Sequence, residues 1–179
     1  MGHPESGQWR TLYSHAESLY SQAVMEIAIK KISPTYQQSR SLFKLLDVHN
    51  MAHCPPEECH LTQPDEWDRI DSILLGVFCD GTLCGMGGLK FGDDYAEVSR
   101  MFILEGYRGK GLAVRLLGEL EKEAMNRGKL TLKLETSDKF ENAFRLYLKY
   151  GFNRCEPFGE YVHAMHQHVY MEKDIDCEG

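Results

Sequence analysis

The sequence predicts an α/β fold in which one sheet is flanked by helices. Several short stretches alternate apolar and polar residues, which is the period of a half-buried strand. Longer stretches repeat apolar residues every three or four positions, which is typical of amphipathic helices. Glycines, Asp-Gly and a proline separate these stretches, so we expect the element order β-α-βββ-α-β-α-ββ.

The first half of the chain is expected to hold four strands and one helix. Ser33-Pro34 ends the first strand and begins a helix that runs to about Leu46. A loop rich in proline, cysteine and glutamate follows at residues 53–65. Asp80-Gly81 is a strong hairpin turn between the next two strands. The four strands span residues 26–32, 73–79, 84–90 and 95–104.

The second half is expected to hold two helices and three strands. A helix over residues 110–127 carries one apolar stripe and is closed by Gly128. A second helix over residues 140–150 ends at Gly151. The strands span residues 130–135, 152–155 and 166–173.

Residues 25–174 are expected to form one domain, followed by a short tail at residues 175–179. Residues 1–24 differ from the rest, because their apolar side chains fit an amphipathic helix. That stripe would cover either its own domain or a second subunit of a homodimer. The strand pattern opens at Met25, so residues 1–24 are either an extension ahead of a natural start or part of the native chain.

Composition is that of an ordinary globular protein. The chain has 179 residues, 42% hydrophobic and 26% charged, which suits one domain with a sizeable core. The net charge of −7 argues against nucleic acid or an anionic membrane as a partner, since both attract clustered Lys and Arg.

The sequence also predicts a cytoplasmic location. No apolar run reaches the ~20 residues of a membrane span, and the first residues lack the pattern of a secretory signal. In a reducing compartment the six cysteines are expected to be thiols. Cys79 and Cys84 flank the Asp-Gly turn and would face each other across the hairpin.

The stretch Tyr107–Ala113, Tyr-Arg-Gly-Lys-Gly-Leu-Ala, lies between a predicted strand and a predicted helix. Gly109 and Gly111 let the backbone bend tightly and approach a ligand closely. The N–H groups of a first helical turn lack partners inside the helix, so together with Arg108 and Lys110 they would hold a phosphate. The spacing fits neither a P-loop nor a dinucleotide fingerprint. A pyrophosphate turn and a plain strand-to-helix turn both remain open on these residues alone.

Motifs in a fixed order resemble the GNAT N-acetyltransferase superfamily. Arg108–Ala113 matches the family pattern Gln/Arg-x-x-Gly-x-Gly/Ala, and residues 96–103 resemble the strand that precedes it. Ala143–Phe152 is similar to the family's Ala-x-x-Leu-Tyr-x-x-x-Gly-Phe helix end. Pro157–Tyr161 and Tyr170–Lys173 resemble a branch of small, mostly uncharacterised acetyltransferases.

The resemblance implies the GNAT acyl-CoA N-acyltransferase fold, a mixed, mostly antiparallel twisted sheet flanked by helices. It implies acetyl-CoA as the cosubstrate and no metal. A bulge would splay the fourth strand from the fifth and open a slot for the pantetheine arm. Many relatives carry Asn or Gln where this chain has Phe140, which leaves Asn142 as the polar candidate nearby. The implied cofactor-binding residues are Met101, Phe102, Ile103, Arg108, Gly109, Lys110, Gly111, Leu112, Ala113, Asn142 and Tyr147.

Two side chains are candidates for the chemistry of acyl transfer to an amine, which needs a base, an oxyanion donor and an acid for the leaving thiolate. Glu97 is the candidate base, acting through a water, because relatives that acetylate lysine carry a glutamate in a similar strand. Tyr147 is the candidate acid, because the family places a tyrosine near the thioester sulfur. A solvated carboxylate and a core aromatic are the respective alternatives. A backbone N–H near Phe102 would serve the oxyanion.

Arg100 and Tyr161 are the candidates for contacts to the acceptor. Arg100 alternates with Val98 and Phe102 on the strand, and a cation there would suit an acceptor with a carboxylate; the alternative is an exposed arginine. The leading function is direct acetyl transfer to the primary amine of a small molecule in a ternary complex. A protein lysine or N-terminal acetyltransferase and a non-catalytic acyl-CoA-binding sensor are the alternatives.

Two groups of potential metal ligands are set aside. His53-Cys54 and Cys59-His60 lie close together, but their spacing is not that of a usual zinc site. His166 and His168 would share a strand face, where a solvated or structural role is favoured over a metal site or a contact to substrate.

Overall fold

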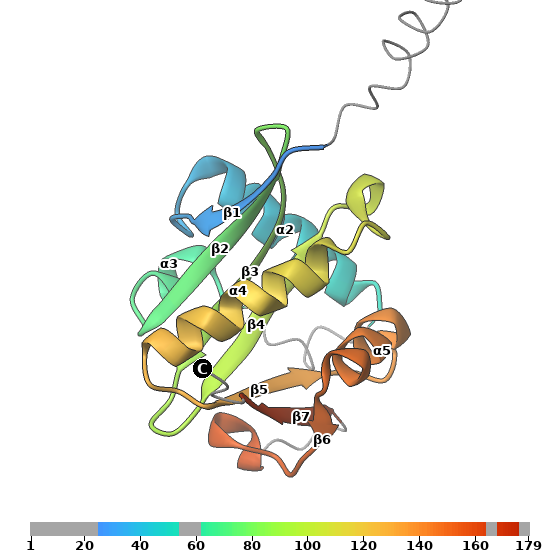
Figure 1. Ribbon diagram of the computed structural model, residues 1–179. Helices are drawn as coiled ribbons and strands as arrows, with labels where there is room; N and C mark the ends of the chain where they lie inside the picture. The colour runs from blue at the N-terminus through green and yellow to red at the C-terminus, as the bar shows by residue number, and fades with distance from the viewer. Residues whose placement is uncertain (1–24, 54–61, 164–167, 176–179) are drawn as a thin grey trace, which may run out of the picture.

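The computed structural model describes residues 25–53, 62–163 and 168–175, which form a seven-stranded sheet flanked by helices (Figure 1). The strand order is β1-β2-β3-β4-β5-β7-β6, and every neighbouring pair is antiparallel except β4 and β5. The mixed, mostly antiparallel sheet predicted from the sequence is therefore confirmed. The strands are β1 (Ile27–Lys31), β2 (Ser72–Cys79), β3 (Thr82–Phe91), β4 (Ala96–Ile103), β5 (Thr131–Thr136), β6 (Asn153–Arg154) and β7 (Val169–Asp174).

The helices follow the predicted order, with a short helix added. They are α2 (Gln37–Met51), α3 (Pro64–Trp67), α4 (Leu112–Asn126) and α5 (Glu141–Tyr150), with 3-10 turns η2 (Glu105–Tyr107) and η3 (Gly159–His163). None of these helices is long and apolar enough to cross a membrane. Residues 1–24 and 176–179, for which an extension and a tail were predicted, lie outside the described residues.

Helix α2 and the loop after it differ most from the prediction, because α2 ends at Met51 and not at about Leu46. Helix α2 begins three residues after Pro34, because the Ser33 hydroxyl accepts the N–H of Thr35 (3.3 Å) and holds a turn there. Helix α3 occupies the end of the predicted loop. A reciprocal capping box between Gln63 and Glu66 starts it, with Pro64 in its first turn.

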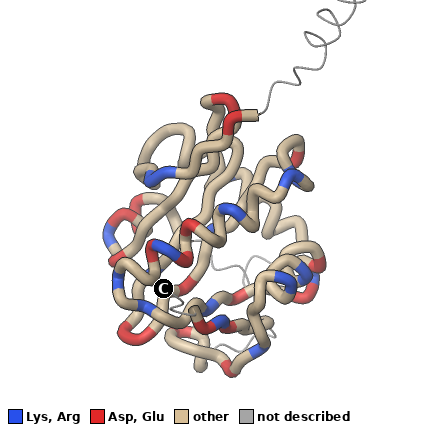
Figure 2. The backbone as a smooth tube through the Cα atoms, in the orientation of Figure 1, with Lys and Arg blue, Asp and Glu red and all other residues tan. Residues whose placement is uncertain are grey.

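The sheet separates two apolar clusters. Leu74 and Leu75 are neighbours on β2 and so point to opposite faces. Leu74 belongs to the cluster that contains Phe43 of α2 and Trp67 of α3, whereas Leu75 belongs to the cluster that contains Leu120 of α4. We call these the α2 face and the α4 face. Figure 1 shows α4 crossing its face of the sheet, and Figure 2 shows acidic and basic residues interspersed along this helix.

Cys79 and Cys84 face each other across the β2–β3 hairpin, as expected. Their Sγ atoms lie 2.9 Å apart, and both side chains are buried free thiols. Burial and the neighbouring thiol raise the pKa of Cys84 to about 12, so it stays protonated at neutral pH.

A β-bulge interrupts β4 at Arg100. Met86 pairs with Phe102 and Gly88 pairs with Ser99, so two residues of β4 oppose the single residue Gly87. Arg100 takes a left-handed conformation with φ of 57°, which costs a non-glycine residue about 1–3 kcal/mol. Opposite the bulge, a Cβ on Gly87 would lie 2.5 Å from the sulfur of Met101 and 2.9 Å from a methyl group of Leu116, so a larger residue there would require these side chains to shift.

Because of the bulge, the predicted alternation of Val98, Arg100 and Phe102 on one face of the strand is wrong. Val98 belongs to the cluster of the α4 face, whereas Phe102 packs against the cluster of the α2 face. Arg100 also lies on the α2 face, with its guanidinium 5.1 Å from the ring centroid of Phe43. The extra residue therefore reverses which side chains of β4 share a face.

Arg100 is held by a buried ion pair with α2. Its Nη1 atom donates to Asp47 Oδ1 at 2.6 Å, and its Nη2 atom donates to the carbonyl of Thr62. The Arg100 side chain is 3% exposed and that of Asp47 is 13% exposed. Burial lowers the pKa of Arg100, and the charge of Asp47 opposes that shift.

Strands β4 and β5 diverge immediately before the bulge. Their parallel pairing is limited to Ala96 with Leu132 and Glu97 with Lys133. Figure 1 shows the two strands running apart beyond that point. The edge of β4 that faces β5 is therefore unpaired from Val98 onward, in the place where the resemblance predicts the pantetheine arm.

Removing the carboxylate of Asp47 should destabilise the protein strongly, because the buried guanidinium of Arg100 would lose its counter-charge. We expect Asp47→Ala to lower the free energy of unfolding in urea by about 3–5 kcal/mol. The control is Asp71→Ala, which removes an exposed pair with Arg127 and should cost less than about 1 kcal/mol. Equal losses in the two variants would contradict the proposed anchoring of the bulge.

Candidate active site

The glycine turn leads from β4 into α4. Gly109 and Gly111 have φ values of 76° and 74°, a left-handed conformation that favours glycine. Gly111 is the N-cap of α4, where no side chain caps the helix and no acidic residue lies in the first turn. A Cβ on either glycine would meet no atom within 4 Å, so the space above the turn is open.

The backbone N–H groups of residues 109–114 have no hydrogen-bond acceptor among the described residues. They lie at the N-terminus of α4, where the helix dipole favours an anion. Open space, unpaired donors and two nearby cations fit the pyrophosphate of coenzyme A. Leu112 is buried and Ala113 half-buried in the same turn, so their contribution to this site would come from the main chain.

The two cations of the turn are arranged differently. Arg108 donates from Nε to the carbonyl of Ile103 (2.9 Å), and its guanidinium lies 5.7 Å from the ring centroid of Phe102. It therefore caps the end of β4 as well as adding charge. Lys110 is exposed, with its ammonium 5.4 Å from the ring centroid of Tyr107.

Glu97 is the last residue of β4 that pairs with β5, and it lies on the α2 face. Because it is only 7% exposed, it is not the solvated carboxylate considered as the alternative. Tyr161 donates its hydroxyl to Glu97 Oε1 at 2.8 Å, and Lys90 donates to the same oxygen at 3.2 Å. The Oε2 atom has no donor among the described residues, so one oxygen is held while the other is open to accept a proton.

Tyr161 contacts Glu97 through its hydroxyl and packs through its ring. It lies in a small cluster with Phe158 and Tyr170, with ring centroids 5.2 and 5.5 Å away. Burial and the charge of Glu97 raise the pKa of Tyr161 well above its usual range, so its hydroxyl remains a donor.

Tyr147 projects from α5 into the core of the α4 face. It is 7% exposed, and its ring meets Phe152 edge-on with centroids 5.7 Å apart. Burial, and then the charge of Glu135, raise the pKa of Tyr147 well above its usual range. Its hydroxyl makes no hydrogen bond among the described residues. The side chain thus has the packing of a core aromatic and a protonated hydroxyl that could act as an acid.

The other predicted residues are spread along the same gap. Met101 and Ile103 pack on the α4 face, and Phe102 packs on the α2 face. Asn142 is exposed in the first turn of α5. Phe140, the N-cap of α5, stacks on His49 of α2 at 5.8 Å between ring centroids.

Arg100 was predicted to contact an acceptor carboxylate, but its guanidinium already donates to Asp47 and to the carbonyl of Thr62. A substrate carboxylate would have to displace Asp47 from a buried pair. Sequence spacing could not reveal this partner, because Asp47 lies 53 residues away in the chain.

Three polar residues beside Glu97 were missed as site candidates, and a fourth was considered in another role. From the sequence, Lys90 and Glu135 are strand residues and Tyr170 belongs to a motif of the resemblance, and none of the three is predicted at the site. His168, first considered for metal or substrate, is hydrogen-bonded through Nδ1 to the carboxylate of Glu135, and its side chain is 6% exposed. Alternation places Lys133 and Glu135 on one face of β5, which is the signal that could have identified Glu135.

No group of three His, Cys, Asp or Glu side chains within the described part of the chain could hold a metal ion. Of the residues first considered as zinc ligands, Cys54, Cys59 and His60 lie outside that part, as does His166.

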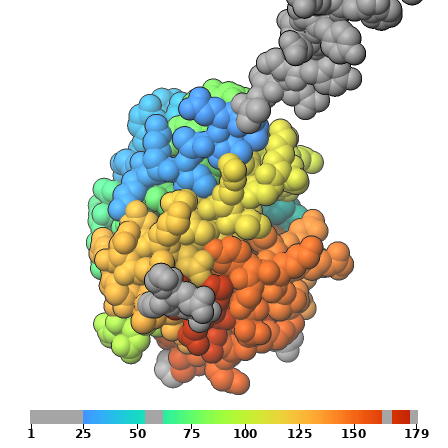
Figure 3. All heavy atoms as spheres, viewed as in Figure 1, coloured from blue at the N-terminus to red at the C-terminus, as the bar shows by residue number. Residues whose placement is uncertain are grey.

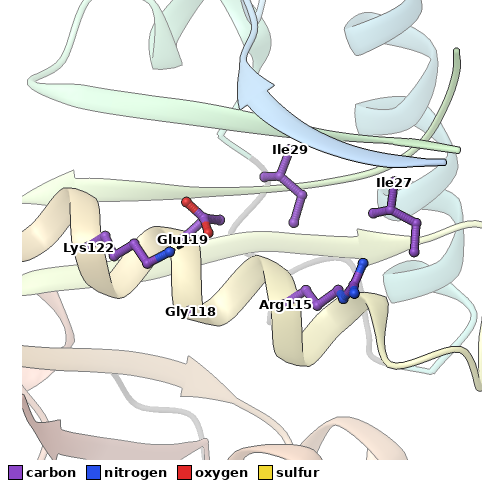
Figure 4. A pocket seen from close by; sticks show the side chains of 6 residues that line it. All are labelled: Ile27, Ile29, Arg115, Gly118, Glu119 and Lys122. Atoms are coloured by element: carbon purple, nitrogen blue, oxygen red, sulfur yellow. Dashed lines mark hydrogen bonds and ion pairs between the residues drawn. The ribbon is translucent and has the colours of Figure 1, made fainter.

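A groove of about 470 Å³ lies away from the candidate site, between β1 and α4. Figure 3 shows these two elements side by side on the surface, and Figure 4 shows the groove's polar rim. Its lining comprises Ile27, Ile29, Arg115, Gly118, Glu119 and Lys122, with no contribution from β4 or β5.

Comparison with known proteins gives consistent matches. The sequence profile of the Acetyltransferase (GNAT) family matches residues 40–152. An IAA acetyltransferase from Azospirillum brasilense is 32% identical over 137 residues, which is 75% of this chain and 90% of the relative. A Klebsiella pneumoniae structure assigned as an acyl-CoA N-acyltransferase has a TM-score of 0.70 at 26% identity, covering 84% of this chain and 98% of that one.

A further solved structure shares the fold and contains the expected ligand. The PaiA N-acetyltransferase from Thermoplasma acidophilum, solved in complex with coenzyme A, has a TM-score of 0.64 at 23% identity. The match covers 84% of this chain and 99% of that one. With the diverging strands and the glycine turn, the profile and the relatives show that this chain belongs to the GNAT acetyltransferase family.

Proposed function

We propose that the protein transfers the acetyl group of acetyl-CoA to the primary amine of a small molecule, directly within a ternary complex. The observation that carries this proposal is the union of two features: the unpaired edge of β4 and the unpaired N–H groups of residues 109–114. One could pair with the amides of a pantetheine arm, and the other could bind its pyrophosphate. Coenzyme A in the PaiA structure supports the choice of ligand.

Glu97 is proposed to take the proton of the acceptor ammonium through a water. An ammonium has no lone pair, so the amine must be deprotonated before it attacks the thioester. Lys90 and Tyr161 orient the carboxylate through Oε1, which leaves Oε2 to accept the proton. A backbone N–H near Phe102 is the proposed donor to the oxyanion.

Tyr147 is proposed to protonate the departing thiolate. A free thiol has a pKa of about 8.5, so a nearby donor eases its departure at neutral pH. The raised pKa of Tyr147 keeps its phenol protonated throughout the physiological range.

The direct test is thiol release from acetyl-CoA against a panel of primary amines, with calorimetry of acetyl-CoA binding beside it. The proposal requires binding of acetyl-CoA and release of the thiol that depends on the amine. Binding without turnover on any amine would indicate a non-catalytic acyl-CoA sensor. Absence of binding would refute the proposed function.

Gly111→Val should weaken acetyl-CoA binding by at least about tenfold in calorimetry, because a branched side chain is strained at positive φ and fills the space over the N–H groups. The matched control is Gly106→Val in η2, where the space is also open but φ is not positive. Equal affinities in the two variants would contradict the pyrophosphate site.

Glu97→Gln should lower kcat by about 10²–10⁴-fold, because the amide keeps the shape but cannot accept the proton. Glu160→Gln is the control, since Glu160 lies 3.5 Å from the same Lys90 but its side chain is 67% exposed. Steady-state rates at saturating acetyl-CoA and acceptor measure the difference. A kcat equal to that of the control would exclude Glu97 as the base.

Tyr147→Phe should lower kcat by about 10–100-fold at saturating acetyl-CoA while the affinity for acetyl-CoA holds. Because a raised pKa keeps the phenol protonated, its ionisation should cause no fall in the wild-type rate between pH 8 and about 10. Tyr150→Phe on the same helix is the control, since that hydroxyl binds Glu121 at 2.5 Å. An unchanged kcat in Tyr147→Phe would rule out its role as the acid.

A further inference from the structure

Tyr170 on β7 has a buried hydroxyl without a hydrogen-bond partner among the described residues. The residue is 6% exposed. Most buried polar groups in folded proteins are hydrogen-bonded, because an unpaired one loses its bonds to water without replacing them. An unpaired hydroxyl in this position therefore points to a ligand that completes it.

The location of Tyr170 puts that ligand beside the proposed base. Tyr170 pairs with Glu135 across the β5–β7 ladder. Its ring centroid lies 5.5 Å from that of Tyr161, whose hydroxyl binds Glu97 at 2.8 Å. Burial, and then the charge of Glu135, raise the pKa of Tyr170, so the hydroxyl is a donor at neutral pH.

The surrounding charges restrict the group that this donor can bind. Glu97 and Glu135 are the carboxylates nearby, and they would repel a carboxylate on the acceptor. The lysine and arginine side chains of this region form ion pairs with carboxylates of the chain: Lys90 with Glu97 and Glu160, Lys133 with Glu172 and Arg100 with Asp47. A neutral oxygen satisfies the Tyr170 hydroxyl without repulsion from either glutamate.

We propose that Tyr170 is an acceptor-binding residue whose hydroxyl donates to a neutral oxygen of the amine substrate. The acceptor would then be a primary amine that carries a hydroxyl or carbonyl group, such as an amino alcohol or an amino amide, in preference to an amino acid with a free carboxylate. This inference rests on the proposed acetyl transfer to a small amine and adds the chemical class of that amine.

The test compares Tyr170→Phe with wild type on acceptors of one carbon skeleton: propylamine, 3-amino-1-propanol, β-alaninamide and β-alanine. Wild type should prefer the alcohol or the amide. In Tyr170→Phe, the KM for that acceptor should rise about tenfold, as expected for loss of one buried hydrogen bond. The KM for propylamine and the KM for acetyl-CoA should be the same in Tyr170→Phe as in wild type. Tyr36→Phe, at a tyrosine that is 58% exposed, is the matched control.

A stability measurement separates substrate binding from a structural role. Because the hydroxyl has no partner among the described residues, Tyr170→Phe should unfold in urea at the same or a higher midpoint than wild type. A lower midpoint would show that the hydroxyl is already bonded within the protein and would overturn the inference. An unchanged KM for the preferred oxygen-bearing acceptor would overturn it as well.

The inference and the proposed function fail in distinguishable ways. If wild type acetylates propylamine or β-alanine better than the alcohol and the amide, the inference fails and acetyl transfer to small amines stands. If wild type acetylates no amine of an extended panel that includes polyamines, the proposed function fails and the inference fails with it.

Discussion

The buried pair between Arg100 and Asp47 is the interaction on which the site depends. The bulge at Arg100 places a large side chain at positive φ, a conformation that needs compensation from its surroundings. Asp47 and the carbonyl of Thr62 provide that compensation from the segment that covers the α2 face. On an unbulged strand, Arg100 would share a face with Val98 and enter the apolar cluster beneath α4, away from Asp47. The bulge and the ion pair therefore support each other.

The bulge and the early end of β4–β5 pairing act together on the site. Glu97 is the last paired residue before the strands diverge, so a carboxylate is fixed at the narrow end of the gap. The main chain from Val98 onward keeps unpaired groups on its β5 side, and the turn at Gly109 and Gly111 continues this line into the N-terminus of α4. Two stretches of unpaired backbone, the β5 side of β4 and the turn at residues 109–114, thus lie on either side of the hydrogen-bonded η2 turn and lead from an anion-binding site towards the buried carboxylate of Glu97.

Sequence reasoning predicted the features that depend on local patterns. Gly109 and Gly111 were identified by their place between strand and helix, and the predicted element order matches the structure. It failed where a single residue changes the register. The resemblance predicted a bulge in this strand, but nothing in the period of Val98, Arg100 and Phe102 gives its position, because the bulge is stabilised by Asp47, far away in the chain. The hydrogen bond from Tyr161 to Glu97 joins residues 64 apart, so proximity in sequence gave no indication of it.

Electrostatics explains why three tyrosines can serve one site as donors. Glu135 raises the pKa of Tyr147, Tyr161 and Tyr170 through its charge, in addition to the larger effect of burial. A phenol whose pKa is raised remains neutral, and a neutral phenol can donate to Glu97, to a thiolate or to an acceptor oxygen. The pairing of His168 with Glu135 keeps this carboxylate in place. The same negative charge disfavours a carboxylate on the acceptor, so one glutamate on β5 would both maintain the donors and narrow the choice of substrate.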